Sequence, residues 1–380
     1  MQFSIKRENF KNAISKVERI LSKQPSLPIL ANILIKTDKN RLVIASTNLE
    51  IAVKTYAKAK INKEGGLTIP VRVINGFLNN IKDEIIEGEV IKDEFQIKTQ
   101  KHQIKIKGIS LDDYPIIPDN PKESYIEINS SNLIENIPSV LISVARNDTR
   151  QELNGINVVF KKNKMVLAST DGYRLSEVII KLDKNNLSEE YFIFIENTPS
   201  IIIPALTFSE IQKNLNEGML SLIIKQNQLF IGDNSTKIIS KLINGKYIDY
   251  RQILPKKYSI NINIDKNELL DALKIASLVS RDNNNEIEIS GLKSKKELKV
   301  KSFSGEAGEN TSQVLADISG EPFKILFNCK YLMEGLGVIK EERVVLKLNQ
   351  EKSPALIKGV TASKKENPEF SYVIMPIIKS

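Results

Sequence analysis

The sequence predicts an α+β fold of three tandem similar domains, each with antiparallel sheets and two helices. Two observations lead to this fold. A strand with alternating apolar residues runs directly into an amphipathic helix three times, over residues 3–21, 127–145 and 263–279. A second passage from strand to helix follows in each third of the chain, and the other alternating segments are expected to be strands. Helices packed on antiparallel sheets are typical of the α+β class.

The first strand and helix repeat residue by residue. When Ile5, Ile128 and Ile264 are aligned, apolar residues recur five and nine positions later. These residues are Phe10 and Ile14, Leu133 and Ile137, and Leu269 and Leu273. The intervals of 123 and 136 residues exceed the roughly 20 to 50 residues of solenoid repeats. We therefore expect whole domains at residues 1–124, 125–256 and 257–380.

Helix starts are marked by residues that suit them. Pro70, Pro204 and Asn328 end the second strands, where a missing N–H costs nothing or an amide oxygen can cap the helix. Asp265 precedes the first helix of the last domain as an N-cap. Pro138 is expected to kink or interrupt the first helix of the middle domain.

Short alternating runs bounded by turn residues are expected to be strands. They cover residues 41–45, 51–57, 95–106, 155–160, 165–169, 220–225, 229–231, 286–289, 298–302 and 344–348. In each third the last extended run contains tyrosine and proline.

Composition excludes several function classes. The chain has one cysteine, Cys329, and one histidine, His102, so a disulfide framework, a zinc cluster and a histidine-based triad are not expected. The residue pairs 112–113 and 171–172 are interpreted as turns and not as catalytic acids. Because no phosphate-binding loop accompanies them, we expect no enzyme, metal or cofactor. No signal peptide or membrane span is recognisable, which favours a soluble cytoplasmic protein.

The net charge of +9 and the pI near 9.2 are compatible with nucleic-acid binding. An abundance of Ile, Lys and Asn can also reflect genome composition, so the placement of the charges is more informative than their total. On the first helix, Asn12, Lys16, Arg19 and Lys23 line the face opposite the apolar stripe, and this set contains no acid. Two interpretations of this face stay open: it is either a solvated face or a surface for phosphate. A nucleic-acid binder that does not encircle its ligand would need aromatic platforms, and the chain has no Trp and 6% aromatic residues.

Several motifs in order along the chain resemble one family, the bacterial sliding clamps (beta subunit of DNA polymerase III). The matching segments lie at residues 24–32, 46–50, 153–155, 169–175, 240–242, 249–251, 254–255 and 372–376. Each segment alone is weakly specific, but the ordered set covers all three domains.

The resemblance implies a non-enzymatic processivity factor for DNA replication. Two chains would close head to tail into a homodimeric ring of six domains, with twelve helices around duplex DNA. It also implies weak contacts with phosphate that do not depend on sequence. The residues to which the resemblance assigns DNA contact are Lys16, Arg19, Lys23, Arg72, Arg146, Asn147 and Lys274.

The resemblance further implies an apolar groove between the second and third domains. The groove would take short linear motifs of the replicative polymerase catalytic subunit, the clamp loader and repair polymerases. Its implied residues are Leu153, Thr170, Gly172, Tyr173, Arg174, Leu175, Ile248, Ile253, Tyr331, Pro354, Val373, Met375, Pro376 and Ile377.

A dimer interface is also implied. Ile104 and Ile106 of one chain would meet Leu278 and Val279 of the other. Around this apolar centre, Lys98 and Lys101 would pair with Glu306 and Glu309, an arrangement typical of specific interfaces.

Overall fold

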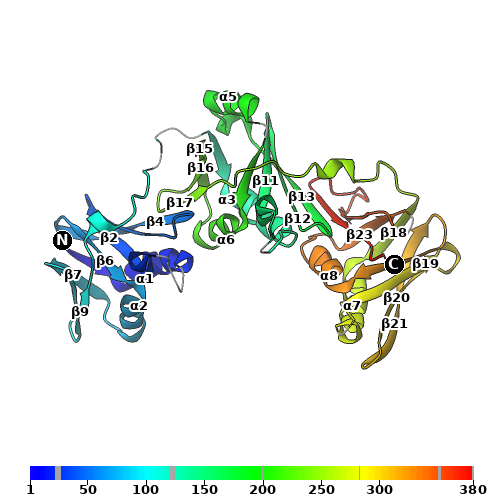
Figure 1. Ribbon diagram of the computed structural model, residues 1–380, viewed down its shortest axis with the longest axis horizontal. Coiled ribbons are helices and arrows are strands. Elements are labelled where there is room, and N and C mark those ends of the chain that lie inside the picture. Colours follow the sequence, from blue (N-terminus) through cyan, green and yellow to red (C-terminus); the bar gives the residue numbers. More distant parts are fainter. Residues whose placement is uncertain are drawn as a thin grey trace. The chain divides into compact units, whose positions relative to one another are not determined.

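The computed structural model describes residues 1–21, 27–119, 121, 125–146, 148–198, 200–281, 283–349 and 352–378 (Figure 1). The chain divides into two compact units. Unit 1 comprises Met1–Ile134, Asn185–Phe194 and Leu206–Leu242, and unit 2 comprises Glu135–Lys184, Ile195–Ala205 and Ile243–Ser380. The predicted middle domain contributes to both units, and the predicted boundaries after residues 124 and 256 stay predictions.

Unit 1 contains two antiparallel sheets. The five-stranded sheet has the order β5-β1-β7-β8-β9, and the eight-stranded sheet has the order β10-β15-β16-β17-β4-β3-β2-β6. The strands of the first sheet are β1 (Gln2–Lys6), β5 (Lys60–Lys63), β7 (Ile85–Ile91), β8 (Glu94–Lys98) and β9 (Gln103–Lys107). Those of the second are β2 (Asn32–Asp38), β3 (Arg41–Thr47), β4 (Ile51–Lys58), β6 (Gly66–Pro70), β10 (Ile126–Asn129), β15 (Met219–Lys225), β16 (Gln228–Gly232) and β17 (Thr236–Lys241).

The eight-stranded sheet combines strands from two thirds of the sequence. Strand β4 lies beside β17, and Ser240 is paired with Ile51 at one end of the ladder (Figure 1). The backbone hydrogen bonds of this ladder join four strands of the middle third and four of the first third into one continuous sheet.

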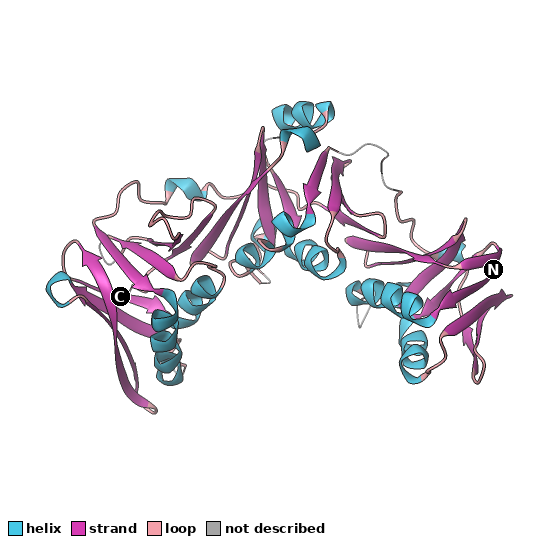
Figure 2. Cartoon of the chain, turned by 180° about the vertical axis from the view of Figure 1, so that it is seen from behind, coloured by secondary structure: helices cyan, strands magenta, loops and turns pink. Residues whose placement is uncertain are grey.

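The main helices of unit 1 are α1 (Arg7–Val17), α2 (Val71–Asn80), α3 (Ser130–Ile134) and α6 (Ala205–Asn214), of which α6 belongs to this unit from Leu206 onward. Helix α1 packs on β3 and β4 and contacts α2. Figure 2 shows α1 and α2 together beside the strands near the N-terminus. Phe10 and Ile14 are buried on the predicted stripe of α1, so its polar side faces away from the core.

Unit 2 is built on one antiparallel sheet of twelve strands, with the order β14-β11-β12-β13-β25-β24-β23-β18-β21-β20-β19-β22. The strands are β11 (Gly155–Lys161), β12 (Lys164–Thr170), β13 (Arg174–Lys181), β14 (Ile201–Pro204), β18 (Ile260–Asp265), β19 (Glu286–Leu292), β20 (Glu297–Ser304), β21 (Gly308–Ser319), β22 (Phe323–Asn328), β23 (Arg343–Leu348), β24 (Ala355–Val360) and β25 (Phe370–Ile374). Its helices are α4 (Ile137–Leu141), α7 (Lys266–Ser280) and α8 (Cys329–Gly337), and α7 contacts α8.

The predicted caps and breaks are confirmed. The Asp265 carboxylate accepts hydrogen bonds from the N–H groups of Asn267 and Glu268 at the start of α7. The Asn328 side chain accepts from the Tyr331 N–H at the start of α8. Pro138 lies in the first turn of α4, and the expected long helix is divided into α3 and α4.

The internal repeat is also visible in the core. The aligned residues of the three first passages are all buried, with exposed fractions from 0% to 3%. They are Ile5, Phe10, Ile14, Ile128, Leu133, Ile137, Ile264, Leu269 and Leu273. The fold class predicted from the sequence is therefore confirmed.

Two local predictions are wrong. The expected strand at residues 95–106 is a hairpin of β8 and β9, and His102 lies in its turn, exposed. The Thr99 hydroxyl accepts a hydrogen bond from the His102 N–H and closes this turn. The middle third also carries an unpredicted helix, α5 (Glu189–Asn197). Within the described ranges, none of the helices has the length and apolar character that a membrane span needs.

Candidate functional site

A tight turn between β12 and β13 organises the site implied for partner peptides. The Asp171 carboxylate accepts from the N–H groups of Tyr173 and Arg174, both at 3.0 Å. The Thr170 hydroxyl accepts from the Gly172 N–H at 3.0 Å and donates to the Arg174 carbonyl at 2.6 Å. Gly172 has a φ of +89°, which glycine adopts without strain. The predicted turn at residues 171–172 is confirmed, and we call residues 170–174 the central turn.

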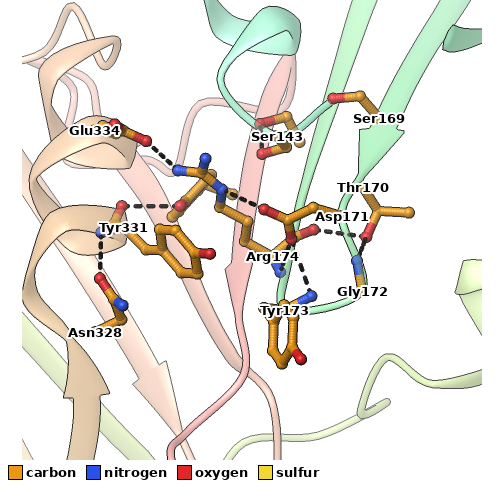
Figure 3. Close-up of polar contacts among 12 residues, drawn as sticks. Ser143, Ser169, Thr170, Asp171, Gly172, Tyr173, Arg174, Asn328, Tyr331 and Glu334 are labelled. Atoms are coloured by element: carbon orange, nitrogen blue, oxygen red, sulfur yellow. Dashed lines mark hydrogen bonds and ion pairs between the residues drawn. The ribbon is translucent and has the colours of Figure 1, made fainter. Parts of the chain in front are cut away.

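The guanidinium of Arg174 joins this turn to helix α8 (Figure 3). Its Nε donates to the Asp171 carboxylate at 2.9 Å, and Nη1 pairs with the Glu334 carboxylate. The guanidinium also lies 4.1 Å from the centre of the Tyr331 ring. Planar arginine can make bidentate ion pairs and stack on an aromatic ring at once, which lysine cannot. The side chain therefore fixes the turn relative to α8.

The electrostatics of Arg174 agree with this fixed role. Burial lowers the pKa of Arg174, but the hydrogen bonds and charges of Glu334, Tyr372 and Asp171 outweigh burial and raise its pKa overall. The group stays charged at every relevant pH. Two carboxylates and one ring thus hold a permanent cation whose exposed side-chain fraction is only 10%.

Strand β25 brings the end of the chain against the turn. Leu175 of β13 is paired with Val373 of β25. Directly after β25, the Met375 N–H donates to the Tyr173 carbonyl at 2.8 Å. The backbone positions of Tyr173 and Met375 are therefore coupled by a hydrogen bond, and we call these residues with their neighbours the peptide site.

The floor of the peptide site is a buried apolar cluster. It consists of Ala145, Leu153, Ala168, Leu175, Ile202, Tyr247, Tyr250 and Val373. The Tyr247 hydroxyl accepts a hydrogen bond from the Thr170 N–H at 3.0 Å, and burial raises the pKa of Tyr247. The cluster therefore supports the central turn through packing and through one buried hydrogen bond.

Apolar side chains close in sequence to members of this cluster remain exposed. The exposed fractions are 66% for Tyr173, 57% for Ile253 and 36% for Ile248. Met375 is half-buried. Neighbouring exposed apolar side chains on a rigid support are typical of an interaction surface. An unbranched methionine can also adapt to different partners.

The other predicted members of the groove differ in their surroundings. Pro354 and Pro376 are buried, and Tyr331 is half-buried beneath Arg174. Ile377 lines a hollow of about 350 Å³ together with Lys324 and Leu326. Ile377 therefore contributes to a surface formed by β22.

The predicted DNA contacts of unit 1 already have protein partners in part. Lys16 Nζ donates to the Thr236 hydroxyl at 2.9 Å, and burial lowers the pKa of Lys16. Arg19 donates to the Asn214 side-chain oxygen at 3.1 Å. Arg72 is exposed on α2. Each of these bonds uses only some of the N–H donors of Lys16 and Arg19, so a contact with phosphate does not require their loss.

In unit 2, Arg146 is exposed after α4, and Lys274 is exposed on α7. Lys274 forms an ion pair of 2.8 Å with Asp271, three residues earlier on the helix. Lys23 and Asn147 lie outside the described residues. The assignment of DNA contact to these residues stays a prediction.

The residues implied in the dimer interface fall into two groups. Leu278 is 68% exposed on α7, and Val279 and Ile104 are half-buried. Ile106 is 4% exposed, because its side chain packs inside its own unit. Leu278 thus offers the largest apolar surface of the four, and Ile106 offers almost none in a single chain.

The sequence did not predict the residues that support the central turn through ion pairs and hydrogen bonds. The prediction that Asp171 is a turn residue is incomplete, because its carboxylate also pairs with Arg174. Glu334 and Tyr247 were not assigned to the site, although both bind the central turn. Asp171 and Glu334 are more than 160 residues apart, so no local sequence pattern predicts that both pair with Arg174. The tyrosine was detectable only as a recurring Tyr at the end of each third.

The fold defines a chain built from three repeated α+β parts. Over residues 1–118, 127–249 and 251–378 the chain matches the N-terminal, central and C-terminal domains of the DNA polymerase III beta subunit. The chain belongs to this family, the bacterial sliding clamps of DNA replication.

Similar proteins match along their whole length. The beta sliding clamp of Synechococcus elongatus is 24% identical over 384 residues, with 99% of each chain covered. That of Staphylococcus aureus strain Mu50 is 27% identical over 395 residues, again with 99% of each covered. Among solved structures, the Bacillus subtilis sliding clamp has a TM-score of 0.91 at 22% identity and full coverage of both chains. The Pseudomonas aeruginosa beta subunit has a TM-score of 0.90 at 23% identity, covering 99% of this chain and 100% of its own.

Proposed function

We propose that two copies of this chain close head to tail into a ring around duplex DNA. The ring tethers the replicative polymerase in the bacterial cytoplasm and makes synthesis processive. The single observation that carries the proposal is the threefold repeat of one α+β part within a chain of the sliding-clamp family. A repeated part joined by a heterologous contact closes into a ring when the rotation between copies completes a turn.

Enclosure removes the need for strong contacts with DNA. A ring stays on DNA because the two are topologically linked, so its lining needs only weak attraction to phosphate, which salt screens. The existing partners of Lys16 and Arg19 are compatible with such weak contacts, because each side chain keeps a protein acceptor within 3.1 Å. The ring would therefore slide.

The peptide site supplies the tether. Tyr173, Ile248 and Ile253 expose apolar surface around a fixed turn, and this surface suits a short linear motif with apolar side chains. The replicative polymerase catalytic subunit, the clamp loader and repair polymerases would compete for it. A protein that works in this way needs no reaction of its own.

The proposal is tested by retention on DNA of different topology. The protein is loaded on nicked circular DNA, and half of the sample is then linearised with a restriction enzyme. We expect retention on the circle in about 0.5 M salt, where phosphate contacts are weak, and rapid loss from the linear form. Equal retention on both forms would reject encirclement.

Separate variants test the tether and the ring. Met375→Ala with Tyr173→Ala should abolish binding of a labelled peptide from the polymerase catalytic subunit and leave the sedimentation coefficient unchanged. Leu278→Asp should do the reverse, because an exposed apolar contact between chains is replaced by a charge. If Leu278→Asp sediments like the unaltered chain, the proposed interface is wrong.

A further inference from the structure

Unit 1 contains a hollow beside the ladder of β4 and β17, and we call it the β4–β17 hollow. Its volume is about 320 Å³, and Ala52, Ile117 and Ile239 line it. Ala52 and Ile239 are buried in one apolar cluster, and Ile117 packs against that cluster. At the rim, Leu49 is 40% exposed and Ile116 is 95% exposed. The hollow thus combines a buried apolar floor with exposed apolar side chains.

The backbone around this hollow repeats the central turn bond for bond. The Thr47 hydroxyl accepts from the Leu49 N–H and donates to the Ile51 carbonyl, both at 3.0 Å. The Asn48 side chain accepts from the N–H groups of Glu50 and Ile51 at 3.0 and 2.9 Å. Leu49, at the place of Gly172, has a φ of +75°. We call residues 47–51 the N-terminal turn.

The neighbouring strand repeats as well. The Lys241 N–H donates to the Glu50 carbonyl at 2.9 Å, as the Met375 N–H donates to the Tyr173 carbonyl. Strand β17 pairs with β4 (Figure 1) in the same way as β25 pairs with β13. The hollow lies at the place in unit 1 that the peptide site occupies in unit 2.

The side chains at the mouth differ in charge. Glu50 and Lys241 replace Tyr173 and Met375, and they form a loose ion pair of 3.7 Å with both side chains more than half exposed. An exposed pair of this length contributes little stability, so either partner is available to a ligand. The mouth of the hollow therefore carries two charges beside the apolar Leu49 and Ile116, whereas the peptide site has Tyr173 and Met375 at the matching positions.

Lysines follow the same face of the sheet. In the strand register, Lys225, Gln228 and Lys241 form one cross-strand row. The next row contains the buried Ile239, and the row after it contains Lys237. Residues directly opposite in a ladder share a face, so the apolar floor lies between a row with two lysines and a row with one, Lys237. This arrangement favours a ligand with acidic groups beside an apolar one.

One wall of the hollow is held in place by an ion pair. Lys54 Nζ donates to the Asp119 carboxylate at 2.9 Å and to the Pro118 carbonyl at 3.3 Å. Lys54 is buried, so it fixes the segment that carries Ile116 and Ile117 over the sheet. A wall fixed before binding lowers the entropic cost of docking.

We propose that the β4–β17 hollow is a second docking site, for an extended acidic peptide that inserts one aliphatic side chain. The leucine or isoleucine of the peptide occupies the apolar floor, and flanking carboxylates pair with Lys241 and its row. The volume lies at the lower end of the range for ligand sites, which suits one branched side chain. The inference rests on the proposed function in that it assigns the same kind of partner, a linear motif, to the repeated turn.

The test uses the full chain with p-benzoylphenylalanine in place of Ile116, a position exposed enough to tolerate it. The probe is the biotinylated peptide Asp-Asp-Leu-Asp-Ile-Asp. Matched probes carry lysine in place of each aspartate or serine in place of both aliphatic residues. We expect photochemical labelling by the acidic peptide. With either matched probe, labelling should be weaker by about fivefold or more.

Two variants locate the binding. Lys241→Glu should reduce labelling about fivefold or more, because it reverses the charge at the mouth. Met375→Ala at the peptide site should leave it unchanged. Absence of labelling, labelling by the lysine peptide to the same extent, or no effect of Lys241→Glu would each overturn the proposal.

A second photoprobe separates this inference from the proposed function. A chain with p-benzoylphenylalanine in place of Tyr173 reports on the peptide site with the polymerase peptide. Loss of that signal alone contradicts the tether and leaves the second site standing. Loss of the signal at position 116 alone contradicts only the second site.

Discussion

The N-terminal turn and the central turn share one backbone and differ in almost every exposed side chain. Both use a threonine hydroxyl and an Asx side chain to bind the same four backbone groups. The position of Ile51 in one turn is that of Arg174 in the other. Ile51 is buried in an apolar setting, whereas Arg174 has two carboxylates and an aromatic ring around it.

This difference shows that the residues that fix the backbone of the turn are not the residues that form its exposed surface. The polar side chains at the first two positions fix the backbone, because they replace hydrogen bonds that the turning chain cannot make within a ladder. The following positions are then free to carry either an apolar mouth or a charged one. The two turns therefore share a hydrogen-bonded backbone, and the exposed side chains of each turn determine which partner that turn fits.

The largest expected effect concerns helix α8, which supports only the central turn. A Cβ on Gly335 would lie 2.2 Å from the ring of the fully buried Tyr372. Gly335→Val should destabilise unit 2 by about 3 kcal/mol through overpacking, measured by urea unfolding. Gly337→Ala on the same helix is the control, because nothing lies within 4 Å of its Cβ position. Equal effects of the two variants would show that α8 does not pack as described.

The next effect concerns the arginine itself. Arg174→Met should cost about 2 kcal/mol, because Asp171 loses a partner while its side chain is only 15% exposed. The peptide affinity should fall with it. Arg150→Met, which removes an exposed bidentate pair with Asp148, is the matched control and should leave stability unchanged. An unchanged unfolding free energy in Arg174→Met would mean that the hydrogen bonds of Thr170 and Asp171 alone maintain the turn.

An exchange at the third turn position tests the shared backbone directly. Gly172→Leu should lower the unfolding free energy by about 1 kcal/mol, because leucine is strained at positive φ. Leu49→Gly should change it little, since relief of that strain is offset by the larger freedom of glycine in the unfolded chain. Thermal unfolding measures both. If Gly172→Leu were neutral and Leu49→Gly harmful, the two turns would not share a conformation.

The smallest effect depends on pH. The hydrogen bond and charge of Lys54 hold the pKa of Asp119 below its ordinary value of 3.8. This interaction stabilises the fold above pH 3.8 and is lost as the pH falls through the lowered pKa. Because the Asp119 side chain is 95% exposed, solvent screening limits the cost of Asp119→Asn to about 0.5 kcal/mol at neutral pH. Unfolding at pH 7 should show this cost, and unfolding near pH 2 should not. A cost that persists in acid would exclude the ion pair as its cause.

The sequence predicted those parts of the fold that local chemistry determines. Pro70, Pro204 and Asn328 marked changes from strand to helix because proline and asparagine act within one turn of where they stand. The repeat predicted the buried stripes for the same reason. The turn at residues 99–102 was not predicted, because it contains no glycine or proline and Thr99 closes it with a side-chain hydrogen bond.

The site was predictable only in part. The apolar members follow from the family resemblance, and Tyr173 and Ile253 are indeed exposed beside a buried floor. The pairing of Arg174 with Glu334 depends on the distant segment that folds into α8, and no spacing in the sequence encodes that contact. The same holds for the β4–β17 hollow, which exists only once β17 pairs with β4.

Covalent closure of the ring tests the central claim most directly. The chain has one cysteine, Cys329, which is buried, so Ile104→Cys with Leu278→Cys introduces the accessible thiols. The variant is loaded on nicked circular DNA, oxidised, and then denatured in detergent. A closed ring around DNA predicts a disulfide-linked dimer that stays with the circle in detergent and leaves after linearisation. A linked dimer that separates from intact circular DNA on denaturation would contradict the account.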